Sequence, residues 1–165
     1  DSGIYGMAGL ALELWLNERV DSRPLFQVHP GISSFQMAAA KLGAPFMHDF
    51  CSISLSDLLT PWNQIEKRIK SAAIGDFVLA IFNPKSIKRD WQLKKTVDLL
   101  LEFRKPSTPV AIARQLGRPE ESIEIHTLET LPFDQVDMLT ILVIGNSQSV
   151  IKNNKFLTPR GYFSN

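Results

Sequence analysis

The sequence predicts a layered α/β fold built around a central sheet. Short apolar runs of strand length alternate along the chain with segments whose apolar residues recur at helical spacing, which is the pattern of this fold class. The run 77–82 is apolar at each position, as expected for a strand that is covered on both faces of its sheet. With 165 residues and 44% hydrophobic content, the chain is long enough to bury a core of one to one and a half domains.

The first part of the chain alternates helix, strand and helix. Clustered leucines predict a helix over 7–16, and the mainly apolar run 25–28 predicts a strand. A Pro-Gly turn follows, after which Ser33 or Ser34 caps a helix that ends at Gly43. Segment 47–54 alternates poorly for a helix, so we expect it to be a connecting strand or loop.

The rest of the chain repeats this alternation. Thr60-Pro61 is a typical helix start, and the apolar residues after it fall on one helical face until Gly75. A further helix is expected from Asp90, and a turn of helix over 133–136. The predicted strands are 77–82, 110–113, 123–126 and 140–144, and 156–158 is a candidate edge strand.

Composition and charge exclude several classes of protein. The formal net charge is +1 and the basic residues are scattered, so nucleic acid is not an expected partner. No apolar stretch approaches the ~18 residues of a membrane span, so no membrane association is expected. The densest basic group is interpreted as a solvated face, with an anchor for an acidic small molecule as the alternative. Its members are Lys85, Lys88, Arg89, Lys94 and Lys95.

Cys51 is the single cysteine of the chain. One thiol gives no disulfide framework and cannot by itself hold a zinc ion or an iron–sulfur cluster. No metal site is therefore predicted, and we expect a reducing compartment, the cytoplasm.

Candidate binding loops follow the predicted strands. Ligands of α/β sheets collect at the carboxyl ends of strands, so we expect these loops to line one cleft. Each loop alone is equally compatible with plain turn chemistry. The loops are 29–34, 83–86, 114–118 and 145–147.

The sequence contains none of the usual catalytic motifs. It has no Walker-type Gly-Lys-Thr, no Gly-x-Ser-x-Gly elbow and no His-Glu-x-x-His, and its histidines stand far apart. His48 and Asp49 are candidates for acid–base chemistry, and a hydrogen-bonded Asp49 beside a buried Cys51 is the alternative interpretation. Binding in a pocket with little side-chain chemistry fits the sequence better.

Several stretches together resemble one family. Over nearly its whole length the chain is similar to the precorrin-3B carbon-17 methyltransferases of cobalamin biosynthesis, within the tetrapyrrole methylase superfamily. The stretch 49–57, Asp-Phe-Cys-Ser-Ile-Ser-Leu-Ser-Asp, points to this subgroup, whereas the Pro-Gly-Ile-Ser loop at 30–33 is shared across the superfamily. The similar segments are 1–8, 29–34, 47–57, 82–86, 138–140 and 144–147.

The resemblance implies the tetrapyrrole methylase fold. Residues 1–45 would be the end of a first α/β domain, and residues 46–165 a second α/β domain with a mixed central sheet. S-adenosyl-L-methionine would lie in the cleft between the two domains, with the tetrapyrrole over it. The start at Asp1, which is not an initiator Met, is accordingly taken as a cut from a longer polypeptide.

The resemblance also implies cofactor-binding positions. Asp1, Ser2, Gly3, Ile4 and Tyr5 would form a loop that contacts S-adenosyl-L-methionine, where the family normally reads Gly-Asp-Pro-Gly and this chain has Ser2 in place of the proline. The matching positions elsewhere are Ser33, Ser34, Asn83, Arg114, Gln115, Leu116 and Thr140.

The implied reaction is methylation of carbon 17 of precorrin-3B, or of its cobalt counterpart, with contraction of the macrocycle to precorrin-4. Ring contraction needs proton movements, for which His48 and Asp49 are the candidates. The acidic macrocycle is expected to pair with Lys85, Lys88 or Arg118. A homodimer is expected from the superfamily. The alternatives are another tetrapyrrole methylase of the corrin or siroheme pathway, or a non-catalytic binding domain in a truncated chain.

Overall fold

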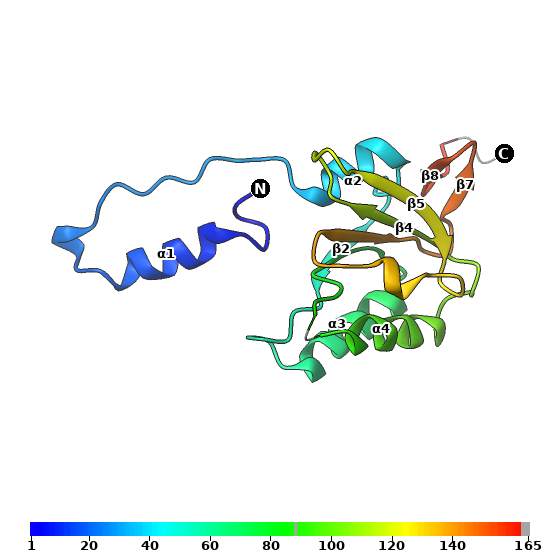
Figure 1. The fold of residues 1–165 in the computed structure, drawn as a ribbon, viewed down its shortest axis with the longest axis horizontal. Coiled ribbons are helices and arrows are strands. Elements are labelled where there is room, and N and C mark those ends of the chain that lie inside the picture. Colours follow the sequence, from blue (N-terminus) through cyan, green and yellow to red (C-terminus); the bar gives the residue numbers. More distant parts are fainter. Residues whose placement is uncertain (88, 163–165) are drawn as a thin grey trace.

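A five-stranded sheet with helices on both faces forms the body of the protein (Figure 1). The computed structural model describes residues 1–87 and 89–162. The strand order in the sheet is β2-β3-β6-β4-β5. The strands are β2 (Phe50–Ser54), β3 (Val78–Phe82), β4 (Pro109–Arg114), β5 (Ser122–Thr127) and β6 (Thr140–Ile144).

The central strand β6 sets the directions of its neighbours. It pairs antiparallel with β3 on one side and with β4 on the other, through Ile81↔Leu142 and Ile112↔Leu142 among other pairs. β2 is parallel to β3, and β5 is antiparallel to β4. The sheet is therefore mixed, with β2, β3 and β4 running in one direction and β5 and β6 in the other.

Alternating side chains on these strands face two different helical layers. On β3, Leu79 and Ile81 pack in the core beneath α3 (Trp62–Ile74) and α4 (Trp91–Leu101), whereas Val78 and Ala80 pack toward α2 (Ser34–Leu42). Both sets are fully buried, which confirms the prediction that 77–82 is a strand covered on both faces. Each face therefore buries its own core.

Most of the other predicted elements are confirmed. α3 follows Pro61 and stops at Gly75, and its buried face carries Ile65, Ile69 and Ala72, as the helical spacing predicted. α2 ends at Gly43, whose φ of 131° is a conformation that suits glycine. The predicted turn of helix appears as a 3₁₀ turn at Phe133–Gln135.

The candidate edge strand near the C-terminus joins a second sheet instead of the main one. This small sheet has the order β1-β8-β7, with β1 (Gly43–Ala44), β7 (Val150–Lys152) and β8 (Lys155–Leu157). β7 and β8 form a hairpin whose turn residues Asn153 and Asn154 have φ of 48° and 58°, as a type I′ turn requires. Phe156 of β8 is fully buried in the core beneath α2.

The N-terminal segment reaches out from this body (Figure 1). Helix α1 (Met7–Asn17) has no buried residue, and the 3₁₀ turn Val20–Ser22 follows it. The chain then folds back on α1, because Trp15 Nε1 donates a 2.6 Å hydrogen bond to the Pro24 carbonyl and the Arg23 guanidinium lies 4.8 Å from the Trp15 ring centre. The predicted strand at 25–28 is wrong, since these residues are extended but pair with no strand of the described structure.

No described helix combines the length and the apolar character that a bilayer span requires.

Helix α2 packs on the main sheet, and the division of the chain into two domains at residue 45 stays a prediction.

Two isoleucines of α3 provide a matched test of its packing. Ile69 is fully buried, whereas Ile74 on the same helix is 70% exposed. We expect Ile69→Ala to lower the free energy of unfolding by about 2–5 kcal/mol through lost burial and a residual cavity. Ile74→Ala should change it by only about 0.5 kcal/mol or less. Urea unfolding of both variants measures the difference, and equal losses would contradict the packing of α3.

Candidate functional site

Three strands of the main sheet end at the same edge. β2, β3 and β4 run in one direction, so Ser54, Phe82 and Arg114 mark one edge of the sheet, and β6 begins at that edge with Thr140. The chain segments after these strand ends, together with the start of α2, surround two pockets. The two pockets together are the candidate site.

The first pocket, which we call the strand-end pocket, has a volume of about 200 Å³. Five residues predicted to bind the cofactor line it, coming from α2, β6 and the ends of β3 and β4. They are Ser34, Asn83, Gln115, Leu116 and Thr140. The remaining lining is mostly apolar, from Phe82, Ala113, Arg118, Met138, Leu139 and Ile141. The fold thus brings together predicted residues from Ser34 to Thr140, which are far apart in the sequence.

Two residues of this pocket have a left-handed backbone. Asn83 and Gln115 each have a φ of 49° directly after the end of a strand. Asn tolerates this region, whereas for Gln it costs about 1–2 kcal/mol. The Gln115 amide donates to the Leu139 carbonyl at 2.9 Å, which holds the turn against the start of β6. Residues held in this conformation by their surroundings cluster at ligand sites.

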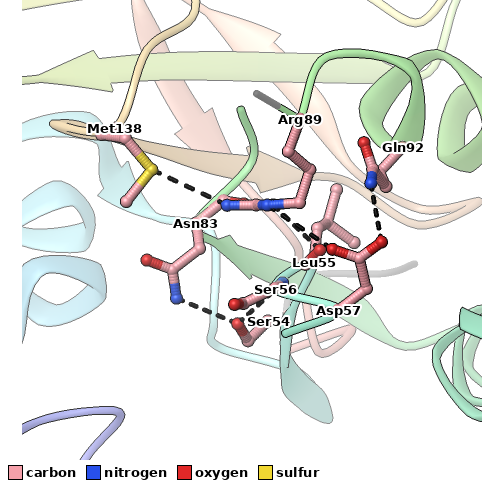
Figure 2. A network of polar contacts seen from close by, with 8 residues as sticks. All are labelled: Ser54, Leu55, Ser56, Asp57, Asn83, Arg89, Gln92 and Met138. Carbon is pink, nitrogen blue, oxygen red and sulfur yellow. Dashed lines mark hydrogen bonds and ion pairs between the residues drawn. The ribbon is translucent and has the colours of Figure 1, made fainter. Parts of the chain in front are cut away.

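The conformation of Asn83 is fixed by a buried arginine (Figure 2). Arg89 Nη1 donates to the Asn83 carbonyl at 2.6 Å and to the Leu55 carbonyl at 2.9 Å. Its Nε lies 3.8 Å from an Asp57 carboxylate oxygen, and its Nη2 contacts the Met138 sulfur at 3.7 Å. One guanidinium therefore joins the ends of β2 and β3 to the loop before β6.

A second bond locks the side chain of Asn83. Its Nδ2 donates to Ser54 Oγ at 2.9 Å, and the Ser56 amide donates to the same oxygen at 3.2 Å (Figure 2). The Asn83 amide is thereby held at the junction of the β2 and β3 ends.

The interpretation of the basic cluster as a solvated face is wrong for Arg89, which is 7% exposed. The Lys85 ammonium also has a partner within the protein, because it donates to the Phe133 carbonyl at 2.9 Å. Lys94 and Lys95 are exposed on α4, as predicted, and Lys88 lies outside the described residues. Among the cations predicted to pair with substrate, Arg118 lines the strand-end pocket.

Arg114 and Thr140 both bind Asp137, which lies in the loop beside the strand-end pocket. Arg114 Nη2 and Thr140 Oγ1 each donate to the Asp137 carboxylate at 2.7 Å, and the Leu139 amide donates at 2.9 Å. Burial alone would raise the pKa of Asp137, but these hydrogen bonds outweigh it and hold the pKa below its usual range. The ion pair orders the loop that forms one wall of the strand-end pocket.

The opening turn is tied to the same region. The Asp1 carboxylate accepts hydrogen bonds from the Gly3 amide at 2.6 Å and from the Gly31 amide at 2.8 Å. A side chain on Gly31 would meet the Asp1 backbone at 3.3 Å, so the two turns approach closely. Two predicted segments, the opening turn and the Pro-Gly loop, therefore meet through one carboxylate.

Tyr5 links the opening turn to the sheet edge and lines the second pocket. Its hydroxyl donates to the Ser52 carbonyl at 3.1 Å, and its ring centre lies 4.9 Å from that of Phe82. The second pocket, which we call the Tyr5 pocket, has a volume of about 530 Å³. Asn83 lines both pockets, so they adjoin at this residue. The lining of the Tyr5 pocket is Tyr5, Ser52, Ile53, Ser54, Ser56, Leu58, Leu59, Thr60, Arg68 and Asn83.

Other predicted positions lie outside both linings. Ser33 is buried and caps α2 through a capping box with Gln36. Arg114 is directed to Asp137 instead of the strand-end pocket. Asp1, Ser2, Gly3 and Ile4 shape the opening turn without lining either pocket.

The loop 145–147 was expected in the same cleft, and this expectation is wrong. β6 is antiparallel to β3, so its carboxyl end lies at the opposite edge of the sheet. There the Ser147 amide and hydroxyl both donate to the Asp76 carboxylate, and Asn146 Nδ2 donates to the Asp76 carbonyl. The buried Arg104 joins this group by donating to the Gly145 and Phe77 carbonyls, each at 2.6 Å.

The structure also places His48 and Asp49 away from the pockets. Both precede β2, and the Asp49 carbonyl accepts a hydrogen bond from the Val78 amide at the edge where β3 begins. The Asp49 side chain is 85% exposed. Their role in proton transfer stays a prediction without geometric support.

A further hollow of about 710 Å³ lies along β2 and α3 and shares Ser52, Ile53 and Arg68 with the Tyr5 pocket. It contains none of the positions predicted to bind the cofactor. Cys51 lines it, and burial raises the pKa of this thiol. A thiol whose pKa is raised is less often the reactive thiolate, so it is a weaker nucleophile than an exposed cysteine.

The chain belongs to the tetrapyrrole (corrin/porphyrin) methylases, because the profile of this family matches residues 1–132. It is 44% identical over 162 residues to a probable cobalt-factor III C(17)-methyltransferase of Salmonella typhimurium, covering 98% of this chain and 66% of that protein.

Two solved structures share the fold. The crystal structure of the methyltransferase CobJ is 34% identical, with a TM-score of 0.91 over 96% of this chain and 66% of that one. Uroporphyrin-III C-methyl transferase from Thermus thermophilus, complexed with S-adenyl homocysteine, is 19% identical. Its TM-score is 0.58 over 88% of this chain and 62% of that one. The chain thus spans just under two thirds of the length of these relatives.

Gln115 provides a test of the strained strand end. Gln115→Ala keeps a side chain at φ of 49°, whereas Gln115→Gly removes it. We expect the glycine variant to be the more stable by about 1 kcal/mol, which reverses the usual order of these residues. At Lys67, an exposed position in the interior of α3, the alanine variant should have the higher free energy of unfolding, by about 1 kcal/mol over the glycine variant. The same order at both sites in urea unfolding would refute the strain at Gln115.

The pH dependence of stability tests the Asp137 contacts. The folded-state pKa is lowered, so the stabilisation by Asp137 is complete above the unfolded-state pKa of about 3.9 and is lost as the pH falls through the lower folded value. We expect the free energy of unfolding to fall more steeply between roughly pH 5 and pH 2 in the unaltered protein than in Asp137→Asn. Parallel curves from chemical unfolding would contradict these contacts.

Proposed function

We propose that this chain forms the larger part of an S-adenosyl-L-methionine-dependent methyltransferase that methylates carbon 17 of a tetrapyrrole in cobalamin biosynthesis. The observation that carries the proposal is the convergence of five family-predicted residues on the strand-end pocket. The name of the Salmonella relative supports the carbon-17 position, and the similarity to CobJ supports the subgroup.

The strand-end pocket fits part of the cofactor. Its volume of about 200 Å³ lies below the roughly 300–1,000 Å³ of a complete small-molecule pocket. Its apolar walls and backbone turns suit the adenine ring, which is recognised through its flat faces and its edge. Phe82, Leu116 and Ile141 supply apolar wall, and the turns at Asn83 and Gln115 bring backbone groups to the rim.

The chemistry requires positioning more than side-chain catalysis. S-adenosyl-L-methionine supplies an electrophilic methyl group, and S-adenosylhomocysteine is its product. Alignment of the reacting atoms can account for about 7–11 kcal/mol of a barrier. A rigid rim serves this purpose, and Arg89 and Asp137 make the rim rigid by fixing the segments around Asn83 and Thr140. This is consistent with a sequence that lacks the usual catalytic motifs.

The acceptor we propose is cobalt-factor III, with precorrin-3B as the cobalt-free counterpart, and the methylation is coupled to ring contraction. The substrate in the name of the Salmonella relative favours the cobalt form. A sister methylase of the corrin or siroheme pathway is the competing function, and the lower identity of the uroporphyrin-III enzyme disfavours it. The two-domain division, the homodimer and a cytoplasmic location stay predictions.

Calorimetry with S-adenosylhomocysteine tests the cofactor site in the full-length protein. We expect binding by the unaltered protein and at least a tenfold loss in Leu116→Asp, because a carboxylate in an apolar wall must be desolvated. Ile74→Asp is the control, since Ile74 is exposed at the end of α3 that faces the opposite sheet edge. Full affinity in Leu116→Asp would refute the strand-end pocket, and no binding by the unaltered protein would refute the methyltransferase.

A further inference from the structure

The Tyr5 pocket is placed where the second substrate of a transfer reaction has to lie. It meets the strand-end pocket at Asn83, whose side chain is locked by its bond to Ser54. Transfer between two bound molecules requires their reacting atoms to be about 3–3.5 Å apart, so the acceptor must occupy a space that adjoins the donor site. The volume of about 530 Å³ falls within the range of small-molecule sites.

Among the residues that the structure describes, the lining of the Tyr5 pocket has a positive charge and no carboxylate. Of its ten lining residues, Arg68 carries the charge, and the others are apolar, hydroxyl-bearing or amide side chains. A pocket of this composition favours an anionic ligand. The arginine fork matches a carboxylate in a two-point geometry that lysine cannot provide.

Arg68 is available for such a ligand. It lies on α3, one residue before the buried Ile69, and its own side chain is exposed. Glu66, the acid nearest to it along the helix, is already paired with Lys70 at 2.9 Å. In the described parts of the chain, none of the ion pairs or side-chain hydrogen bonds involves Arg68.

The walls of the Tyr5 pocket suit a broad, largely apolar ring system. Leu58 and Leu59 are 85% and 98% exposed at the mouth of the pocket, which is unusual for adjacent leucines. Ile53 is buried at its base, and the Tyr5 ring stands against Phe82 on one side. Apolar walls beside a single cation match a macrocycle with carboxylate side chains.

We propose that the Tyr5 pocket receives one carboxylate-bearing edge of the tetrapyrrole acceptor and that Arg68 binds this carboxylate and thereby orients the macrocycle against Asn83. The inference rests on the proposed function, because it assigns the acceptor of the same reaction. It replaces Lys85 in the predicted set of substrate anchors, since the Lys85 ammonium is held by the Phe133 carbonyl.

The test is direct binding of cobalt-factor III, followed by its absorbance, to full-length protein saturated with S-adenosylhomocysteine. Arg68→Gln should weaken binding of the tetrapyrrole by about tenfold or more, because a charge-assisted hydrogen bond is lost. Arg68→Lys should recover part of that loss. Lys94→Gln removes an equal charge from an exposed position on α4 outside both pockets and should bind as the unaltered protein does.

Affinity for S-adenosylhomocysteine, measured in parallel, separates this inference from the proposed function. It should be the same in all four proteins, because Arg68 lies outside the strand-end pocket. Equal tetrapyrrole affinity in Arg68→Gln and the unaltered protein would overturn the role of Arg68. A loss in Lys94→Gln as large as in Arg68→Gln would also overturn it, because the effect would then be one of net charge. Failure of the unaltered protein to bind S-adenosylhomocysteine would instead count against the methyltransferase itself.

Discussion

The antiparallel pairing of β6 with both β3 and β4 is the constraint on which the candidate site depends. Because β6 lies between two strands that run the other way, the ends of β3 and β4 stand on either side of the β6 start. Asn83, Gln115 and Thr140 are far apart in the sequence, and this strand pairing brings them to one edge of the sheet. Reversing β6 would send Thr140 to the edge where Asp76 and Arg104 lie.

Two charged groups, the buried Arg89 and the partly exposed Asp137, convert that arrangement into a defined rim. The buried Arg89 guanidinium has several partners, so it leaves no uncompensated charge in the interior, and the partly exposed Asp137 carboxylate also binds several groups. Arg89 binds two backbone carbonyls together with the side chains of Asp57 and Met138, whereas Asp137 binds the side chains of Arg114 and Thr140 and the Leu139 amide. The rim therefore depends on side-chain and backbone contacts that join strand ends far apart in the sequence.

Local sequence patterns predict individual helices and strands well, but they predict strand pairing and distant contacts less well. The apolar spacing of α3 and the continuous apolar run of β3 are local patterns, and both predictions are confirmed. The segment 25–28 has the composition of a strand, but it pairs with no strand within residues 1–87 and 89–162, and a β-strand needs a partner for its backbone groups. The loop 145–147 was misplaced because strand direction is decided by pairing, which local composition does not reveal. The prediction that Arg89 lies on a solvated face is wrong because its partners Leu55 and Met138 are 34 and 49 residues away, so the local sequence does not reveal them.

The contacts of the opening turn also have a consequence for the order of folding. The Asp1 bond to Gly31 closes a loop of 30 residues, and the Tyr5 bond to Ser52 closes one of 47. The entropic cost of loop closure is incurred before such distant contacts stabilise the chain, and here each closure gains only a few exposed contacts. The sheet that receives Tyr5 must already exist, since Ser52 and Phe82 belong to paired strands. The opening turn is therefore expected to dock last, and to open at a lower free energy than the body to which it docks.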